Sequence, residues 1–591
     1  MSTKSNDVNI VATHDEHHAP VFGANEPITG FDAETSNVPK GYFYSPYFLG
    51  SMAAIGLSLM GSVGGFALAA PILSYINADI GPDPNITWVP LVFPLGLAVG
   101  LTLVGRLSDL FGRRWFFTGG QALGCIGAIV CATARNVPTL IGGTTIVGVA
   151  ASTALSFSFL TGELVPMKYR FIGTSYAYLW VIPFSGLAPA IANSLVVNAN
   201  WRWCYYLMII FDGLAFVAYF FFYHPPTFEM KHKSATRAAF VRNFDYIGTV
   251  LFTGGMVVFL LGISWGGSVY PWKSAAVIST IVIGALALIG FVVWECFANL
   301  EEPLVPMHLF RNRDFNITCG LLAIGASVYY AFGIVWPSMV NVLYASGDPI
   351  YAGWLQCCVG GAFTLGQVTG GFLCEAIGNS RLQIIAVTTV GGALLASTAA
   401  ATLDNVSLPI GLLIVGNFAI GWMESLAQTL CGICVNDQKE IGIAVGIAGS
   451  IRSGISTLAS TIYVVVLNNR LAETVPATVG PAATAAGLPV SSLSSLLSAL
   501  AVGTQDAFDS VQGLDPDILS VAQRAYKEGN RLAFQTVFFV SIAFSGIAVI
   551  LSIWAPNVDN LMTDQIATVL KHDGKFAADV EKSEVKLEQK E

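Results

Sequence analysis

The stretch Gly105-Arg-Leu-Ser-Asp109-Leu-Phe-Gly112-Arg113-Arg114 decides the fold, because its spacing occurs twice in the chain. The second copy, Gly371-Phe-Leu-Cys-Glu375-Ala-Ile-Gly378-Asn-Ser-Arg381, repeats the glycine, the acid and the second glycine 266 positions later. Trp88 and Trp354 are separated by the same 266 positions. Four matches at one offset predict that the chain is built from two related halves.

Long apolar runs surround both copies. Charged residues make up 11% of the 591 residues, whereas a soluble globular chain carries about 25%. Hydrophobic residues make up 54%, and the mean hydropathy is +0.65. Met1–Ser45 holds eight charges and Pro556–Glu591 holds thirteen, which leaves 44 for the 510 residues between them. The body of the chain is therefore predicted to lie in a lipid bilayer.

Fourteen apolar runs of about 20 residues have the length of membrane-spanning helices. Such continuous runs exclude the shorter alternating strands of an outer-membrane barrel. The repeat relates spans 1–6 to spans 9–14 and leaves spans 7 and 8 as an inserted pair. The predicted spans are 48–71, 88–106, 115–134, 138–160, 171–195, 204–223, 245–265, 275–297, 317–340, 351–374, 382–402, 408–431, 441–468 and 532–554.

The predicted fold is an all-α polytopic membrane protein with two six-helix halves and two inserted helices. Residues 469–530 are expected to form a long outer loop with two possible amphipathic segments, around Ser491–Val502 and Pro516–Lys527. A lid and a passive linker are both open readings of this loop. The predicted units are a disordered cytoplasmic tail (1–45), the first half (46–223), a basic loop with the inserted helices and a linker (224–316), the second half (317–555) and a charged cytoplasmic tail (556–591).

The basic residues predict the orientation. With both termini in the cytoplasm, the short inner loops hold thirteen Lys and Arg residues and the short outer loops hold three. The expected location is the plasma membrane, with a vacuolar or vesicle membrane as the alternative. Asn85-Ile-Thr and Asn405-Val-Ser are sequons on the predicted outside, so both asparagines are candidate glycosylation sites.

The two repeated loops are candidates for a conformational gate. Their glycines permit tight turns and close helix approach, Asp109 can cap the following helix, and the arginines can pair with carboxylates or helix C-termini across the interface of the halves. The alternative is an ordinary positive inner loop. The gate candidates are Gly105, Asp109, Gly112, Arg113, Arg114, Glu163, Gly371, Glu375, Gly378 and Arg381.

The first loop, read as GRLSDLFGRRW, resembles the signature of the major facilitator superfamily between spans 2 and 3. Fourteen spans resemble its drug:proton antiporter branch. The long penultimate loop and three further stretches resemble the fungal trichothecene efflux pump family, over about residues 45–555: Thr161-Gly-Glu-Leu-Val-Pro-Met-Lys-Tyr-Arg170, Trp201-Arg-Trp-Cys-Tyr-Tyr206 and Gly449-Ser-Ile-Arg-Ser453. The resemblance implies export of a small organic toxin, drug or secondary metabolite, coupled to protons, by rocking of the two halves.

Two single positions and one motif depart from the pattern of the antiporter branch. Ser62 stands where the branch has an aspartate in span 1, and Thr144 stands where it has an arginine in span 4. The span 5 antiporter motif is reduced to Ala188-Pro189-Ala-Ile-Ala192-Asn193. Proton antiport therefore does not carry over residue by residue, and any coupling groups must lie elsewhere.

Only three charges lie well inside the predicted spans: Asp212, Glu424 and Arg452. A charge at this depth normally faces a partner or a cavity. One hypothesis is that Glu424 or Asp212 exchanges a proton, because burial favours the neutral carboxyl and an approaching Arg452 favours the charged one. The alternative is a static Glu424–Arg452 pair that fixes helix packing.

Polar and aromatic side chains within the spans suit an amphipathic, largely uncharged cargo held by stacking and a few hydrogen bonds. Packing against lipid is the competing explanation for each of them. The cargo candidates are Tyr178, Trp180, Asn193, Gln367, Asn417, Trp422 and Gln428, within a wider group that includes Tyr176, Tyr329, Tyr330, Trp336 and Gln356.

Other classes of protein are excluded or secondary. A net charge of −9 and a pI near 5.3 leave no basic surface for nucleic acid. No GxxxxGK[ST] pattern is present, so ATP does not drive transport within this chain. None of the seven histidines falls mid-span, so we expect no metal, cofactor or enzymatic activity. The expected partners are a small-molecule cargo, protons and lipid, with the protein as a monomer. Siderophore-iron uptake and nutrient sensing are the alternative functions.

Overall fold

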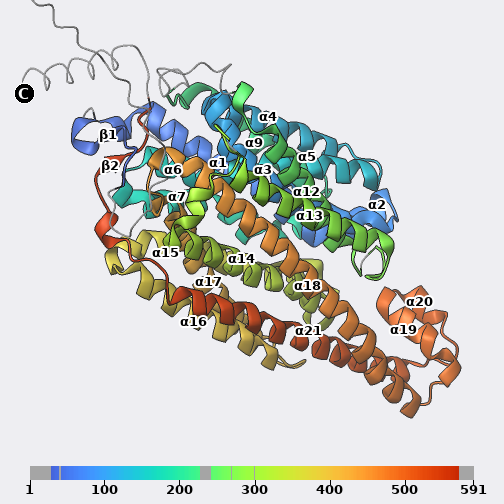
Figure 1. The fold of residues 1–591 in the computed structure, drawn as a ribbon. Helices are drawn as coiled ribbons and strands as arrows, with labels where there is room; N and C mark the ends of the chain where they lie inside the picture. The colour runs from blue at the N-terminus through green and yellow to red at the C-terminus, as the bar shows by residue number, and fades with distance from the viewer. Residues whose placement is uncertain are drawn as a thin grey trace, which may run out of the picture.

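The computed structural model describes residues 28–38, 41–226, 241–267, 269–298, 300–345 and 347–570. Fourteen helices in these ranges are long and apolar enough to cross a membrane, which confirms the predicted all-α membrane fold. The helices run side by side in an elongated bundle (Figure 1). The strands β1 (Ala33–Glu34) and β2 (Gln565–Ile566) pair at one end, which we name the terminal end. The other end is the distal end.

The first half contains six of the spans. Spans 2, 3 and 6 are single helices, whereas spans 1, 4 and 5 are each made of two helices. Span 5 is broken by a π-helical turn at Ile182–Gly186, which contains Pro183. The helices are α1 (Pro46–Ala67), α2 (Leu73–Ile80), α3 (Trp88–Phe111), α4 (Arg113–Ala132), α5 (Val137–Leu155), α6 (Phe157–Leu164), α7 (Arg170–Val181), α8 (Ala188–Asn198) and α9 (Trp203–Phe222).

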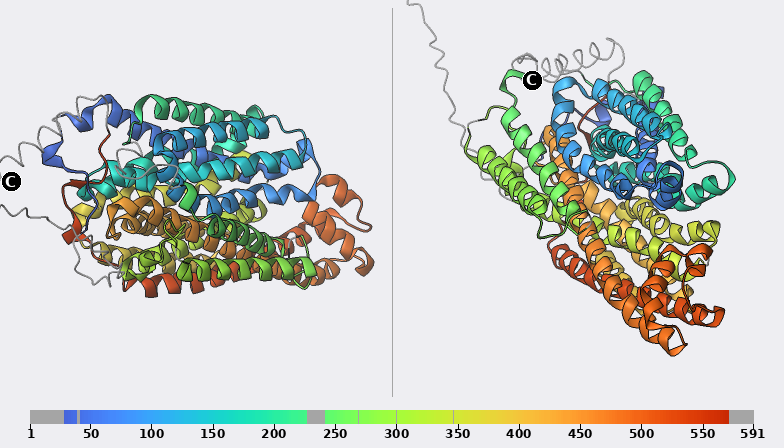
Figure 2. Two further views of the ribbon diagram at one scale, coloured as in Figure 1. Left: turned by 45° about the horizontal axis from the view of Figure 1, so that its top comes forward. Right: turned by 90° about the vertical axis from the view of Figure 1, so that its right-hand side faces the viewer.

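The second half repeats this arrangement, and the inserted pair lies beside the junction of the halves (Figure 2, right). The inserted helix α12 packs along α13 and also touches one helix of each half, α3 and α18. The helices of the pair are α12 (Tyr246–Trp265) and α13 (Ala275–Phe297). Those of the second half are α14 (Arg313–Met339), α15 (Pro349–Ile377), α16 (Ser380–Ser397), α17 (Ser407–Ile433), α18 (Ile441–Ala485) and α21 (Pro516–Ser552).

The two halves meet along two seams, α3 against α18 and α15 against α7 and α8. The repeated glycines lie on these seams. A Cβ atom on Gly105 of α3 would lie 2.5 Å from the carbonyl oxygen of Gly442, and one on Gly371 of α15 would lie 2.5 Å from that of Phe171. Glycine therefore allows the halves to approach closely at both seams.

The second glycine of each repeated loop has a different role. Gly112 has φ of 88° and Gly378 has φ of 68°, a region of backbone conformation that strongly favours glycine. Gly112 caps the start of α4, and Gly378 caps the end of α15. The two copies of the motif therefore make equivalent sharp turns at the terminal end.

The region expected as a long outer loop is largely helical. The helix α18 continues past its expected end at 468 to Ala485, and α21 begins at Pro516 rather than 532. With 45 residues, α18 is about 68 Å long, whereas a bilayer with its headgroups is about 40–45 Å thick. Both helices therefore project beyond the distal end, where α19 (Leu493–Val502) and α20 (Gln505–Asp509) cover them (Figure 1).

This distal hairpin, residues 469–530, is helical because it has its own apolar core. The hydroxyl of Thr474 donates to the carbonyl of Gly529 at 2.7 Å and joins the two long helices. Val479, Leu496 and Phe508 belong to a cluster of buried side chains between the helices. Tertiary packing here outweighs the loop tendency of the Pro- and Gly-rich sequence.

The terminal segments also differ from the disordered tails that we expected. Residues 28–38 form turns and β1, and residues 553–570 run across the terminal end as a strap that contains β2 and is buried over residues 566–570. Ala33 pairs with Ile566 and Glu34 with Gln565 in an antiparallel register. The remaining tail positions 1–27, 39–40 and 571–591, and positions 227–240 of the basic loop, lie outside the described residues.

Candidate cargo cavity and charge pair

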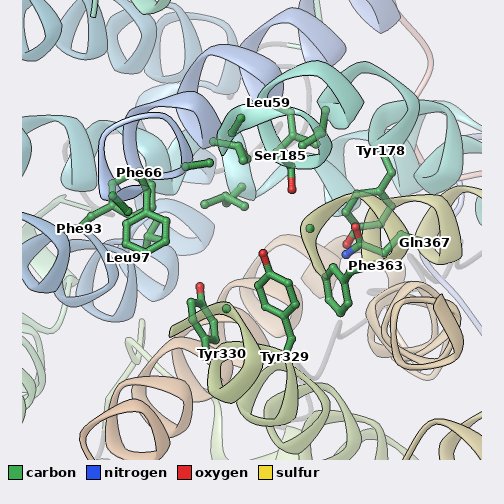
Figure 3. Close-up of a pocket in the computed structure, with 18 of the residues that line it drawn as sticks. Leu59, Phe66, Phe93, Leu97, Tyr178, Ser185, Tyr329, Tyr330, Phe363 and Gln367 are labelled. Carbon is green, nitrogen blue, oxygen red and sulfur yellow. The ribbon is translucent and has the colours of Figure 1, made fainter. Parts of the chain in front are cut away.

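A cavity of about 200 Å³ lies between the two halves. Residues of α1, α3 and α7 line one side, and residues of α14, α15 and α18 line the other (Figure 3). Binding sites for drug-sized molecules usually have about 300–1,000 Å³. The cavity in this form is therefore smaller than a typical cargo site.

The two walls of the cavity differ in chemistry. The wall from the first half is apolar except for Tyr178 and Ser185. The wall from the second half carries a charged group, Arg452, and several groups that can form hydrogen bonds. These polar residues are Tyr329, Tyr330, Gln356, Gln367, Gln428 and Ser453. A cargo here would contact apolar surface on one side and hydrogen-bonding groups on the other.

Aromatic rings form part of both walls. The Tyr329 ring stacks on Phe363 with centroids 4.1 Å apart, and Phe66 stacks on Phe93 at 5.5 Å. The hydroxyl groups of Tyr329 and Tyr330 point from α14 toward the first half (Figure 3). Flat rings with polar tips suit an amphipathic ligand.

Three of the seven cargo candidates line the cavity, namely Tyr178, Gln367 and Gln428. The other four lie away from its wall. The Trp180 ring packs against Gly56 of α1, and the Trp422 indole donates to Gln383 at 3.2 Å.

Asn193 and Asn417 are the remaining two. Each donates to a carbonyl of its own helix at 2.9 Å, Asn193 to Pro189 and Asn417 to Leu413. Their NH2 groups are therefore used within the helices rather than toward a cargo.

Further residues on the wall came from the wider group or were missed in the sequence. Tyr329, Tyr330 and Gln356 of the wider group line the cavity, and Ser185 and Ser453 were not anticipated. Ser185 lies in the π-helical turn, so the proline that breaks span 5 was the available signal for it.

The pair Glu424–Arg452 lies beside the cavity. The Arg452 Nε donates to Glu424 Oε1 at 2.8 Å, and a second guanidinium nitrogen contacts the same oxygen. Glu424 is fully buried, whereas the Arg452 side chain is 18% exposed and lines the cavity. Glu424 Oε2 is buried without a hydrogen-bond partner among the described residues. Arg452 therefore stands between the cavity and the buried carboxylate.

Asp212 lies apart from this pair, inside the first half. It is 1% exposed on α9, and its carboxylate lies against Gly61 of α1 and Gly124 of α4. Its Oδ1 has no hydrogen-bond partner among the described residues. The three mid-span charges thus form one ion pair and one separate carboxyl.

Polar contacts between the halves close the cavity toward the terminal end. Gln428 donates to Ser158 Oγ at 2.6 Å, and Ser175 Oγ donates to the carbonyl of Gln367 at 3.1 Å. The Arg170 guanidinium donates to Gln438 Oε1 at 2.8 Å. Each of these three contacts joins one residue of the first half to one residue of the second half, so all three must break if the terminal end opens.

We expected Arg113 and Arg114 of the first repeated loop to pair across the interface of the halves. The contacts described below instead lie within the first half. Arg113 forms a buried ion pair with Glu163 of the same half and lies over the Phe159 ring. Arg114 donates to the carbonyl of Phe220, also in the first half, at 2.7 Å. The carboxylate of Glu163 and the C-terminal end of α9 both belong to the first half. The two arginines therefore fix the internal packing of that half.

The second loop behaves in the same way. Arg381 donates to the carbonyl of Ile553 at the end of α21, within the second half. Glu375 is exposed to solvent. The side chain of Asp109 lies outside the described part of the chain.

The two sequon asparagines lie at the distal end. Asn85 precedes α3 and Asn405 precedes α17, and both are exposed. Both positions are sterically open to a glycan.

Two related six-helix halves around a shared cavity define a secondary transporter of the major facilitator type. Two solved structures share this fold. The human organic anion transporter MFSD10 (TETRAN) has a TM-score of 0.51 at 10% identity and covers 85% of this chain and 100% of that chain. The proton:xylose symporter XylE has a TM-score of 0.50 at 14% identity and covers 89% and 99%, respectively.

Sequence comparison narrows the class. A family profile described as "Fungal trichothecene efflux pump (TRI12)" matches residues 28–589, and the chain belongs to this family. The trichothecene efflux pump TRI12 of Fusarium sporotrichioides is 28% identical over 90% of this chain and 90% of that protein. The MFS-type transporter prx5 of Penicillium rubens is 31% identical over 86% of this chain and 90% of that protein. The resemblance seen in the motifs is thereby confirmed.

Proposed function

We propose that the protein is a monomeric secondary transporter that exports an amphipathic, largely uncharged toxin or secondary metabolite from the cytoplasm. The family supports export rather than siderophore-iron uptake, because its name and that of the relative from Fusarium sporotrichioides describe efflux pumps. The terminal end faces the cytoplasm and the distal end faces outward. The thirteen-to-three excess of basic residues in the inner loops supports this orientation at the plasma membrane.

The cavity supports the cargo class. Its apolar wall favours a hydrophobic face, and Gln356, Gln367 and Gln428 offer hydrogen bonds to oxygen atoms of a compact polycyclic molecule. Among the described residues that line the cavity, Arg452 is the only one with a charged side chain. Because Glu424 neutralises it, an uncharged cargo requires no further counter-ion.

Transport proceeds by rocking of the two halves about the cavity. The cavity of about 200 Å³ is too small for a drug-sized cargo, so the halves must separate on one side to load it. The close seams at Gly105 and Gly371 and the polar contacts at the terminal end are the interactions that this motion breaks. When the transporter opens outward, the two halves separate at the distal end instead.

Protons enter the cycle at Glu424, and the single observation that carries this proposal is the Glu424–Arg452 pair. Arg452 is partly exposed to the cavity, so cargo or a movement of α18 can draw it away from Glu424. A carboxylate left without its cation in an apolar interior takes up a proton. Return of Arg452 then favours release of that proton, which alternates with cargo binding.

The test is pH-driven transport by Glu424→Gln in inside-out vesicles with a labelled trichothecene as the probe. The amide keeps the shape of the side chain and removes the titrating proton, so we expect loss of transport driven by an imposed pH gradient. Glu473→Gln, an exposed glutamate farther along α18, is the matched control. Full pH-driven transport by Glu424→Gln at normal membrane abundance would exclude Glu424 as the coupling group and leave the pair a packing element.

A further inference from the structure

We infer that the two chain termini form a crossed clasp, which must release before the cavity can open at the terminal end. The terminal clasp consists of residues 28–38 and 553–570. Each segment is bound to the half that it does not belong to, so the clasp joins the halves independently of the seams and the repeated loops. The inference rests on the proposed rocking motion.

The C-terminal segment is first anchored to its own half. The backbone nitrogen of Asn379 donates to Asp559 Oδ2 at 2.9 Å, and Ser380 Oγ donates to the carbonyl of Pro556 at 3.2 Å. Asn379 and Ser380 belong to the loop at the end of the second copy of the repeat. This anchor fixes the direction in which the segment leaves α21.

The same segment then crosses to the first half. The backbone nitrogen of Lys168 donates to the carbonyl of Thr563 at 3.0 Å, and the Lys168 ammonium pairs with Asp564 at 2.6 Å. Farther along, the backbone nitrogen of Thr568 donates to the carbonyl of Glu163 at 2.9 Å. Glu163 therefore contacts the clasp through its backbone and Arg113 through its carboxylate.

The last described residue is held as well. The backbone nitrogen of Leu570 donates to the Tyr42 hydroxyl, just before α1, at 2.9 Å. Burial raises the pKa of Tyr42 to about 12, which agrees with an enclosed position for this hydroxyl. All five residues from Ile566 to Leu570 are at most 6% exposed. A segment so deeply buried is a structural part of the terminal end.

The N-terminal segment crosses in the opposite direction. The backbone nitrogen of Thr29 donates to the carbonyl of Asn436, and the Thr29 carbonyl accepts from the backbone nitrogen of Gln438, both at 2.9 Å. These partners precede α18 in the second half. Gly30 has φ of 88° and lies against the same loop, where a Cβ would come within 2.9 Å of the Gln438 nitrogen.

The two crossing segments are then joined to each other by the β1–β2 pairing. The backbone nitrogens of Asp32 and Thr35 donate to the carbonyls of Ile566 and Asp564, each at 3.0 Å. A rotation that separates the halves at the terminal end must break both the bonds at Thr29 and those at Lys168 and Thr568. Because these are mainly backbone bonds between fixed partners, and the bond at Thr568 is buried, they form a specific latch rather than a loose tail contact.

The first experiment uses paired cysteines joined by a short, reducible bifunctional thiosulfonate. Lys168→Cys with Asp564→Cys ties the C-terminal segment to the opposite half. Asn379→Cys with Asp559→Cys ties it to its own half and serves as the matched control. The unaltered chain treated with the same reagent accounts for the native cysteines.

Two readouts separate this inference from the proposed function. One is transport of labelled trichothecene. The other is the rate at which a membrane-impermeant maleimide, added at the terminal end, modifies Ser453→Cys on the cavity wall. We expect the cross-half link to abolish both and reduction to restore both, whereas the own-half link changes neither by more than about twofold.

A second experiment needs no cross-link. Thr568→Pro removes the backbone N–H that bonds to Glu163, whereas Thr568→Ala keeps it. Loss of one hydrogen bond corresponds to about a 2- to 12-fold shift in an equilibrium. We therefore expect the proline variant to increase the maleimide labelling rate by about that factor, with the alanine variant near the unaltered rate.

Unchanged labelling in the cross-half pair and in Thr568→Pro would overturn the clasp, whatever the transport result. Absence of trichothecene transport in the unaltered chain, together with the expected labelling changes, would instead overturn the proposed cargo and leave the clasp in place.

Discussion

The carbonyl oxygen of Gly442 lies where a side chain on Gly105 would begin, so these two glycines set the distance between the halves at one seam. Gly371 has the equivalent position at the other seam, against Phe171. The internal repeat therefore places one contact-limiting glycine in each half. The seams are closest when the terminal end is closed, which makes these contacts specific to one phase of transport.

We predict that Gly105→Ala and Gly371→Ala each slow transport by disfavouring the closed terminal end. Overpacking of a tight contact costs about 1–3 kcal/mol, which corresponds to about a 5- to 150-fold shift between the two phases. Gly119→Ala on α4 is the control, because a Cβ there meets nothing within 4 Å. Transport of the two seam variants at the rate of Gly119→Ala would show that the seams do not limit closure.

We predict that Glu163→Gln lowers the thermal stability of the purified protein. The substitution takes the carboxylate away from the buried Arg113 guanidinium, and breaking a buried ion pair on one side costs about 3–5 kcal/mol. Asp404→Asn is the comparison, because Asp404 and Arg524 are 86% and 76% exposed and 3.9 Å apart. Such a surface pair contributes at most about 1 kcal/mol. Equal melting temperatures for the two variants in detergent would contradict this difference.

We predict a pH-dependent contribution from His308. Its Nε2 lies 2.8 Å from Glu440 Oε2, and this hydrogen bond raises the pKa of His308 above its ordinary value of 6.5. Because the folded-state pKa is raised, the stabilisation is complete below pH 6.5 and is lost as the pH rises through the raised value. The His308 side chain is 39% exposed, so the effect is at most about 1 kcal/mol.

The measurement for His308 is the melting temperature between pH 5.5 and 8.5, compared with His308→Gln. The difference between the two proteins should be largest at the acidic end and shrink toward the alkaline end. A difference that is constant or grows with pH would contradict the assignment of the hydrogen bond to the charged imidazole.

We predict that Asp212→Asn keeps pH-driven transport, unlike Glu424→Gln. Asp212 lies inside the first half and does not line the cavity, and the amide has the same shape and is less costly to bury than a charged carboxylate. The melting temperature should stay the same or rise. Loss of pH-driven transport at normal abundance would instead move the proton site into the first half.

The order of helices and the location of the repeated loops were accessible from the sequence, because hydropathy and a fixed offset are properties of the chain itself. The facing of individual side chains was not. Span helices are apolar on all sides, so periodicity does not distinguish a cavity face from a lipid face. Trp180 and Asn417 were candidates by residue type alone, and the structure places both away from the cavity wall.

Contacts between distant segments were also beyond the sequence. Arg113 was recognisable as a loop arginine, but the choice of Glu163 as its partner depends on how α4 and α6 pack. The terminal segments were read as disordered because their composition is polar, although backbone hydrogen bonds, which any residue can make, hold residues 28–38 and 563–570 in place. The distal hairpin was read as a loop because part of it is rich in Pro and Gly, although an apolar core of its own holds it in place.

Because α18 is 45 residues long, a small tilt of this helix moves its far end by a large distance. Arg452 sits in its first third, beside Glu424, and the helix continues without interruption to Ala485. A rigid rod that tilts about a point in the bilayer moves its far end in proportion to the distance from that point. A probe on the distal hairpin will therefore report a tilt of the second half with a larger displacement than any probe inside the bilayer. In the proposed orientation and rocking motion, a probe on the hairpin would follow the transport cycle from outside the membrane without touching the cargo cavity.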